Sequence, residues 1–143
     1  MASTLKLNTL TGASTAGSIA VTGEGNSTTT NLQQGLGKTW ITYSNTSATS
    51  VNDSFNVSSV VDNGTGDQTH NHTNSYRANQ AYTSGGVAAN ASDVTTTSYQ
   101  LQPLQDGSVL TTSVRIVNIY NTNTGCDVAD YAYLALTCHG DLA

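Results

Sequence analysis

The sequence predicts an all-β protein, an antiparallel β-sandwich or jelly-roll-like knob with an extended N-terminal arm. Short runs rich in Val, Ile, Thr and Tyr recur between turns of Gly, Asn and Asp, which is typical of sandwiches and barrels. No segment combines helical spacing of apolar residues with capping residues, so little or no helix is expected. Only 36% of the residues are hydrophobic and 9% are charged, which indicates uncharged polar surfaces.

Residues 1–37 are expected to form an attachment arm, and residues 38–143 the knob domain. In the arm, three leucines between residues 5 and 10 predict one short strand, and residues 18–22 predict a second. So little apolar area cannot offset an ordering entropy of about 1–2 kcal/mol per residue. The arm is therefore either a mobile linker or a segment that a partner orders, and we favour the second interpretation.

The first strand of the knob is predicted over residues 38–44. Trp40, the only tryptophan, lies on one face of this strand, whereas Ile41 and Tyr43 lie on the other. Successive side chains of a strand point to opposite faces. Large residues on both faces indicate a strand in the middle of a sheet, or one between the core and a neighbouring subunit.

Residues 53–74 predict two antiparallel strands joined by a tight turn. Apolar residues at positions 55, 57 and 61 suit a strand with one buried face. The pair Asn63-Gly64 best tolerates positive φ at both central positions of a type I′ turn. Residues 68–74 would then pair back on the first strand.

The later strands are predicted over residues 81–83, 94–101, 108–120 and 130–138, with a loop over 84–93 and a polar turn over 121–127. The last two strands are expected to pair as an antiparallel hairpin. Three tyrosines are either exposed contact residues or, in the interpretation we favour, packed in the sheet. They are Tyr76, Tyr82 and Tyr99.

The predicted hairpin resembles one that is repeated in fibre and fibre-like virion proteins of tailed bacteriophages. The match is nearly contiguous between SFNVSSVVDNGTGDQTHNHTN, residues 54–74, and the pattern SFNVSS-x-x-DNGTGDYT-x-NFT. DNGTGD is its most specific part. Looser similarity extends to residues 1–7, 38–41 and 131–141. The resemblance implies a virion structural protein, assembled in the host cytoplasm and displayed on the virion surface.

The partners that the resemblance implies are sister chains in a homotrimer, the major capsid or tail protein of the particle, and a host-surface glycan. A sparse apolar interior also favours chains that pool apolar surface. Capsid decoration or a head fibre is slightly favoured over a short tail fibre. With a net charge of −5 and only four Lys and Arg, nucleic acid is not an expected partner. The sequence contains no run of about 20 apolar residues, so membrane insertion is not expected.

His70 and His72 are the most specific candidates for chemistry. Both imidazoles are expected to project from the same face of a strand. Three such pairs around a trimer axis would offer six nitrogens to a divalent transition metal, an arrangement similar to the His-x-His rings of some phage fibre tips. The hairpins that this segment resembles have a branched aliphatic residue and Phe at these positions. The competing interpretation is two hydrogen-bonded histidines without a metal.

Cys126 and Cys138 have three interpretations. They form a disulfide if the last two strands bring their Cα atoms to about 4.4–6.8 Å. They are two free, mostly buried thiols if cytoplasmic assembly decides their state, which we favour. A zinc site with His139 is the third interpretation, but it lacks a C-x-x-C pair and a clear fourth ligand.

No enzymatic activity and no cofactor are expected. Glu24 is the only glutamate and lies in the arm, whereas glycoside hydrolysis needs two placed carboxylates. The aspartates mostly lie in turns, where they cap backbone groups. The alternatives are a free carbohydrate-binding module, which would be monomeric with aligned exposed aromatics, and a small polysaccharide depolymerase, which would need acidic pairs in a groove.

Overall fold

The computed structural model describes residues 5–12, 19–22, 29–89, 99–103, 107–122 and 124–143. It divides into two compact units, Met1–Leu36 and Gly37–Ala143. This division lies one residue from the expected boundary between arm and knob.

The described residues of the first unit form two short strands and a single helical turn. β1 (Ala20–Thr22) pairs antiparallel with β2 (Thr29–Asn31), and α1 (Leu32–Gly35) follows. β1 lies within the predicted 18–22 strand. The strand predicted from the leucines is wrong, because residues 5–12 form none and the three leucines are exposed. An apolar side chain with nothing to pack against gives a strand no stabilisation.

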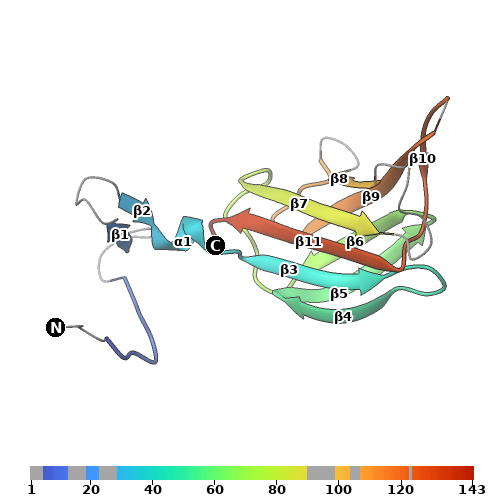
Figure 1. The fold of residues 1–143 in the computed structure, drawn as a ribbon. Helices are drawn as coiled ribbons and strands as arrows, with labels where there is room; N and C mark the ends of the chain where they lie inside the picture. The colour runs from blue at the N-terminus through green and yellow to red at the C-terminus, as the bar shows by residue number, and fades with distance from the viewer. Residues whose placement is uncertain (1–4, 13–18, 23–28, 90–98, 104–106, 123) are drawn as a thin grey trace. The chain divides into compact units, whose positions relative to one another are not determined.

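The second unit consists of two antiparallel sheets that pack face to face (Figure 1). One sheet has the order β4 (Ser50–Phe55), β3 (Thr39–Ser44), β11 (Tyr133–Gly140), β7 (Tyr82–Ala89). The other has the order β10 (Gly125–Val128), β9 (Ser113–Thr122), β6 (Asp67–His72), β5 (Val57–Gly64), and β8 (Tyr99–Pro103) also pairs with β9. The prediction of an all-β, antiparallel, sandwich-like fold is confirmed.

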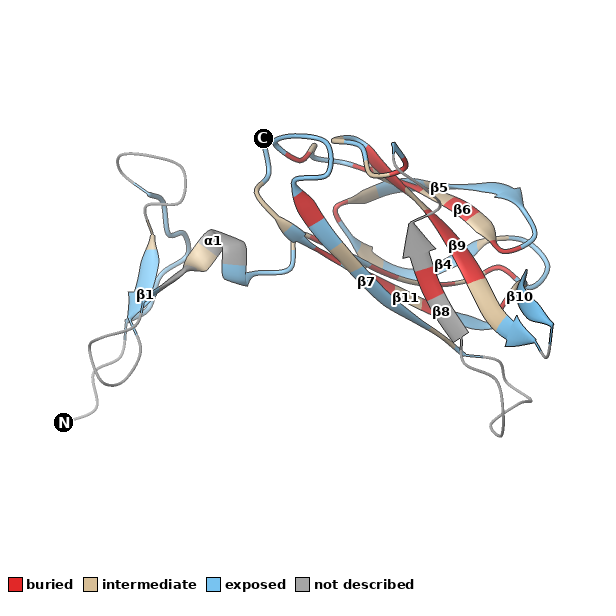
Figure 2. Ribbon diagram, turned by 90° about the horizontal axis from the view of Figure 1, so that it is seen from above, coloured by how far each residue is buried: buried red, intermediate tan, exposed pale blue. Residues whose placement is uncertain are grey.

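Alternation along the strands places the core between the two sheets. Figure 2 shows buried residues alternating with exposed ones in strands of both layers. β3 lies between β4 and β11, as the large residues on both its faces predicted. Its inner side chains pack with those of β11 and β9, and the central core residues are Ile41, Tyr43, Val114, Ile116, Leu134 and Leu136.

The predicted hairpin is present as β5 and β6, but its first strand is divided. Phe55 ends β4 in one sheet, whereas Val57 begins β5 in the other. Between them, Asn56 has a φ of 60°. Its side-chain Nδ2 donates to Thr39 Oγ1 at 3.1 Å, and its Oδ1 accepts the backbone N–H of Asn74 at 2.7 Å. These tertiary contacts turn the chain from one sheet to the other.

The turn of this hairpin is not centred on the Asn-Gly pair. Gly64 pairs directly with Asp67, so Thr65 and Gly66 are the loop residues. Gly66 has a φ of 68°, its N–H donates to Asp130 Oδ1 at 2.8 Å, and its carbonyl accepts the N–H of Asn118 at 2.7 Å. Contacts with distant segments therefore fix the turn one pair of residues later than the local signal predicted.

Two further predictions are corrected by the sheet pairing. The last two strands do not form a hairpin, because β9 and β11 lie in different sheets and β11 pairs with β3 and β7. Residues 125–128, predicted as part of a turn, form β10 against β9. β7 also extends through residues 84–89 of the predicted loop. There Gly86 pairs with Leu136 of β11. It packs so closely against the Ala135 carbonyl that no side chain would fit, which explains the glycine at this position of the strand.

The Gly66→Ala variant is expected to unfold at lower urea concentration than wild type. A non-glycine residue in this backbone conformation is strained by about 1–3 kcal/mol, and a Cβ would lie 2.9 Å from the Ala129 nitrogen. Gly85→Ala is the matched control, because a Cβ there meets nothing within 4 Å. Its stability should stay within about 0.5 kcal/mol of wild type. Equal loss in both variants would contradict the expectation.

Candidate functional site

The outer face of the β4-β3-β11-β7 sheet carries the exposed aromatic side chains of the described part of the knob. We call this surface the aromatic face. It belongs to the sheet that contains β3 and β11 in Figure 1. Alternation with buried neighbours along β3 and β11, together with strand register, assigns its residues. They include Trp40, Thr42, Asp53, Phe55, Thr83, Gly85, Val87, Ala89, Tyr133, Ala135, Thr137 and His139.

One row of the aromatic face crosses all four strands. Trp40 lies directly opposite Phe55 on β4 and opposite Thr137 on β11, and Thr137 lies opposite Gly85 on β7. Trp40 is 36% exposed and Phe55 is 53% exposed. Directly opposite residues in neighbouring strands have Cβ atoms about 4.5–5.5 Å apart. The two aromatic side chains therefore form one exposed pair.

The next row is almost free of charge. Thr42 lies opposite Asp53 on one side and Ala135 on the other, and Ala135 lies opposite Val87. Asp53 is the only residue with a formal charge in these two rows. Tyr133, which is 46% exposed, follows farther along β11. The surface thus combines aromatic and small apolar groups with a few hydroxyl and carboxylate oxygens.

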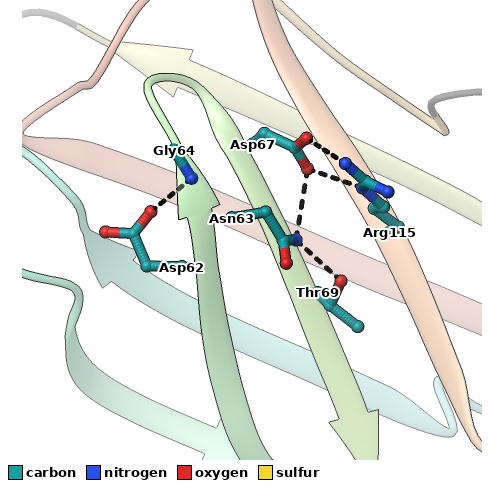
Figure 3. Close-up of polar contacts among 6 residues, drawn as sticks. All are labelled: Asp62, Asn63, Gly64, Asp67, Thr69 and Arg115. Carbon is teal, nitrogen blue, oxygen red and sulfur yellow. Dashed lines mark hydrogen bonds and ion pairs between the residues drawn. The ribbon is translucent and has the colours of Figure 1, made fainter.

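The turn of the β5–β6 hairpin and the neighbouring part of β9 are polar and internally paired. Arg115 donates from Nε and Nη2 to the two carboxylate oxygens of Asp67, at 2.9 and 2.6 Å (Figure 3). This hydrogen bonding lowers the pKa of Asp67. Asn63 Nδ2 donates to Thr69 Oγ1 at 2.9 Å. These polar groups satisfy one another's hydrogen bonds, whereas the side chains of the aromatic face are open to a partner.

His70 and His72 project to the same face of β6, as predicted, but that face is the interior of the sandwich. His70 is fully buried and packs edge-to-face against Tyr43, with 4.9 Å between the ring centroids. Its ring lies against the backbone of Val114 on the neighbouring strand β9, an interaction that opposes the lowering of its pKa by burial. His72 Nε2 lies 3.3 Å from Tyr82 Oη.

This placement does not provide the trimer-axis metal site. A metal shared by three chains needs imidazoles at the surface, whereas these rings lie between the two sheets of one chain. Within the described ranges, no group of three or more His, Cys, Asp or Glu could hold a metal ion.

The tyrosines follow the packing interpretation where the structure describes them. Tyr76 and Tyr82 are buried and stack on each other with their ring centroids 3.9 Å apart. The Tyr82 hydroxyl lies within hydrogen-bond distance of the carbonyls of Leu110 and Ser113. The side chain of Tyr99 lies outside the described residues.

Cys126 and Cys138 are free thiols in different sheets. Cys126 is exposed on β10, and Cys138 is buried on β11. The disulfide depended on a hairpin between the last two strands, which the chain does not form. His139 follows Cys138 directly and so points to the opposite face of β11, which leaves the proposed zinc ligands apart. Burial raises the pKa of Cys138 to about 12.

Only part of the aromatic face could be predicted from the sequence. Alternation placed Trp40 on the face opposite Ile41 and Tyr43 but did not indicate which of the two faces is exposed. Nothing local indicated that Phe55 would lie beside it, because β4 was not separated from the following strand. Gly85 and Val87 were missed because their glycine-rich segment was predicted as a loop.

No family model, no curated protein and no solved structure matches this chain. Among the described residues, no helix is long and apolar enough to cross a membrane.

The stability of the protein is expected to fall as the pH is lowered from 7 to 5. Burial, reinforced by the neighbouring His72, lowers the pKa of His70 from 6.5 to about 4. In this interval the unfolded chain binds a proton that the folded chain does not, so each pH unit below 6.5 costs up to about 1.4 kcal/mol. Urea unfolding at both pH values measures the loss.

Substitution of the buried ring provides the control for this pH dependence. His70→Leu should reduce the loss between pH 7 and 5, and the remainder belongs to His72, whose pKa burial also lowers. His139→Gln should leave the loss unchanged, because His139 is exposed. A wild-type protein equally stable at both pH values would contradict the buried placement of His70.

One thiol per chain is expected to react with Ellman's reagent in the native protein, and two in denaturant. Cys126 is exposed, whereas Cys138 is buried and its raised pKa disfavours the reactive thiolate. Cys126→Ser should abolish the native reaction, and Cys138→Ser should preserve it. A protein without reactive thiols even in denaturant would instead contain the disulfide.

Proposed function

We propose that the chain is a non-enzymatic structural protein of a tailed-bacteriophage virion. In this proposal it is a homotrimeric knob or fibre, exposed on the virion surface, which stabilises the particle and adheres to the host. Capsid decoration or a head fibre is slightly preferred to a short tail fibre. Assembly takes place in the host cytoplasm.

The observation that carries the proposal is the DNGTGD segment. Each distinctive residue in it has a local structural task. The Gly64 N–H donates to Asp62 Oδ1 at 2.9 Å, Gly66 occupies the left-handed position, and Asp67 pairs with Arg115 (Figure 3). The segment forms the turn of the β5–β6 hairpin together with contacts from distant residues. The presence of this hairpin supports its resemblance to phage fibre hairpins.

The homotrimer is supported by the composition of the interior. Fully buried Gln68, His70 and Asn118 occupy inner positions on β6 and β9 that apolar residues could otherwise fill. The hydrophobic stabilisation available to one chain is correspondingly smaller, because it scales with the apolar area buried. Contact with sister chains would add to this stabilisation.

The strand pairing favours a jelly-roll-like topology. β3 pairs with β11 and β6 pairs with β9, although these strands lie far apart in the sequence.

The attachment role is assigned to the first unit, Met1–Leu36. Its leucines at positions 5, 7 and 10 are between 55% and 81% exposed, so they are available to a sister chain or to the major capsid or tail protein. Display of several knobs on one particle would let weak individual contacts with a host-surface glycan act together.

The aromatic face favours one alternative, a free carbohydrate-binding module, which would use the same exposed side chains as a monomer. The depolymerase has less support. Asp130 is held by the Gly66 N–H and Asn45 Nδ2, at 2.8 and 2.9 Å, and Asp67 is paired with Arg115. Both carboxylates therefore serve the fold.

Light scattering of the purified full chain is expected to give three times the chain mass of 14.8 kDa. A monomer at micromolar concentration would contradict the homotrimer and favour the carbohydrate-binding module. Particles of the phage that encodes the chain, purified on a density gradient, should contain it. Recovery only as free protein would contradict the virion assignment.

A further inference from the structure

We propose that the aromatic face binds a neutral polysaccharide, whose sugar rings stack on Trp40 and Phe55. The inference rests on the proposed function, because it names the class of host-surface partner and the surface that contacts it. Exposed aromatic pairs need an explanation, since clustered apolar surface on a soluble domain commonly marks an interaction site. The neighbouring β3 residues Ile41 and Tyr43 are fully buried. Strand β3 therefore already fills its place in the core with these residues, and the exposure of Trp40 is not explained by packing.

The size of the face favours an extended small partner over a second copy of the chain. Four strands about 4.8 Å apart, each contributing a few rows of residues about 3.3 Å apart, give a surface of about 14 by 20 Å. A stable protein interface buries about 800 Å² of accessible surface on each partner, so a second copy of the chain seated here would also have to cover residues beyond the aromatic face. A chain of a few sugar units fits within it.

The chemistry of the face favours an uncharged partner. Asp53 is the only formally charged residue in the two central rows, and Lys38 precedes β3 at one end of the face. An anionic polymer would require clustered cations, and a cationic one more carboxylates. A pyranose ring has an apolar C–H face that packs on an aromatic ring, and hydroxyl groups around its edge. Thr42, Thr137 and Asp53 offer oxygens that can hydrogen-bond those hydroxyls.

The register gives the polysaccharide a path across the strands. From the Phe55–Trp40 pair the row continues over Thr137 to Gly85. A Cβ added to Gly85 would meet nothing within 4 Å, so the surface is open and low at this position. A sugar chain stacked on Trp40 can continue there without meeting a side chain. This position also allows a substitution that blocks the face without disturbing the core.

The test is affinity electrophoresis of the full chain in native gels that contain laminarin, xylan, mannan, dextran or starch, with alginate as the anionic comparison. At least one neutral polysaccharide should retard the wild-type protein. Gly85→Arg, Trp40→Ala and Phe55→Ala should each weaken this binding by about tenfold or more. Val61→Arg is the matched control, because it adds the same charge at an exposed position on β5 in the other sheet.

Three results of the binding test would overturn the inference. They are migration unaffected by all five neutral polysaccharides, retardation by alginate alone, and retardation that survives the three substitutions on the aromatic face. Loss of the oligomer in Gly85→Arg but not in Val61→Arg would also overturn it, because the face would then contact a second copy. Light scattering of the same samples separates the two proposals. A trimer without sugar binding refutes only this inference, and a sugar-binding monomer refutes only the homotrimer.

Discussion

The structure depends on closing two sheets around an interior whose centre is partly polar. Gln68 and Asn118 are fully buried on the paired strands β6 and β9, and Asn118 Nδ2 donates to Gln68 Oε1 at 3.0 Å. Tyr43 reaches the same oxygen from the opposite sheet at 3.5 Å. The other polar atom of each amide, Gln68 Nε2 and Asn118 Oδ1, is buried without a hydrogen-bond partner among the described residues. Such an unpaired group costs about 1–3 kcal/mol, so the polar centre that links the two sheets also lowers the stability of the fold.

Polar side chains also join the sheets where the chain passes between them. Asn45, at the end of β3, donates from Nδ2 to Asp130 at 2.9 Å, and Asp130 accepts the N–H of Gly66 in the β5–β6 turn. Asn56 makes the corresponding connection where β4 gives way to β5. A chain rich in asparagine thus uses this residue where a more apolar domain would use packing. The same arrangement leaves Trp40 and Phe55 side by side on an outer surface.

The sequence predicted several of the strands but not which strands pair with one another. Alternation predicted the two faces of β3, and the DNGTGD segment predicted the β5–β6 hairpin, because both signals are local. The assignment of strands to sheets depends on contacts between distant segments. Asn56 ends one strand only because Thr39 and Asn74 bind its side chain, and Gly86 lies in a strand only because Ala135 lies against it. The Trp40–Phe55 pair could not be predicted for the same reason.

The hairpin turn has a consequence for the chemical ageing of the protein. An Asn-Gly sequence deamidates when the glycine nitrogen attacks the asparagine side-chain carbon and closes a succinimide ring. In Asn63-Gly64 both reactants are held by other groups: the Gly64 N–H donates to Asp62, and the Asn63 amide donates to Thr69. These contacts oppose the reaction at the Asn-Gly pair that ends β5, an advantage for any protein that must persist without resynthesis.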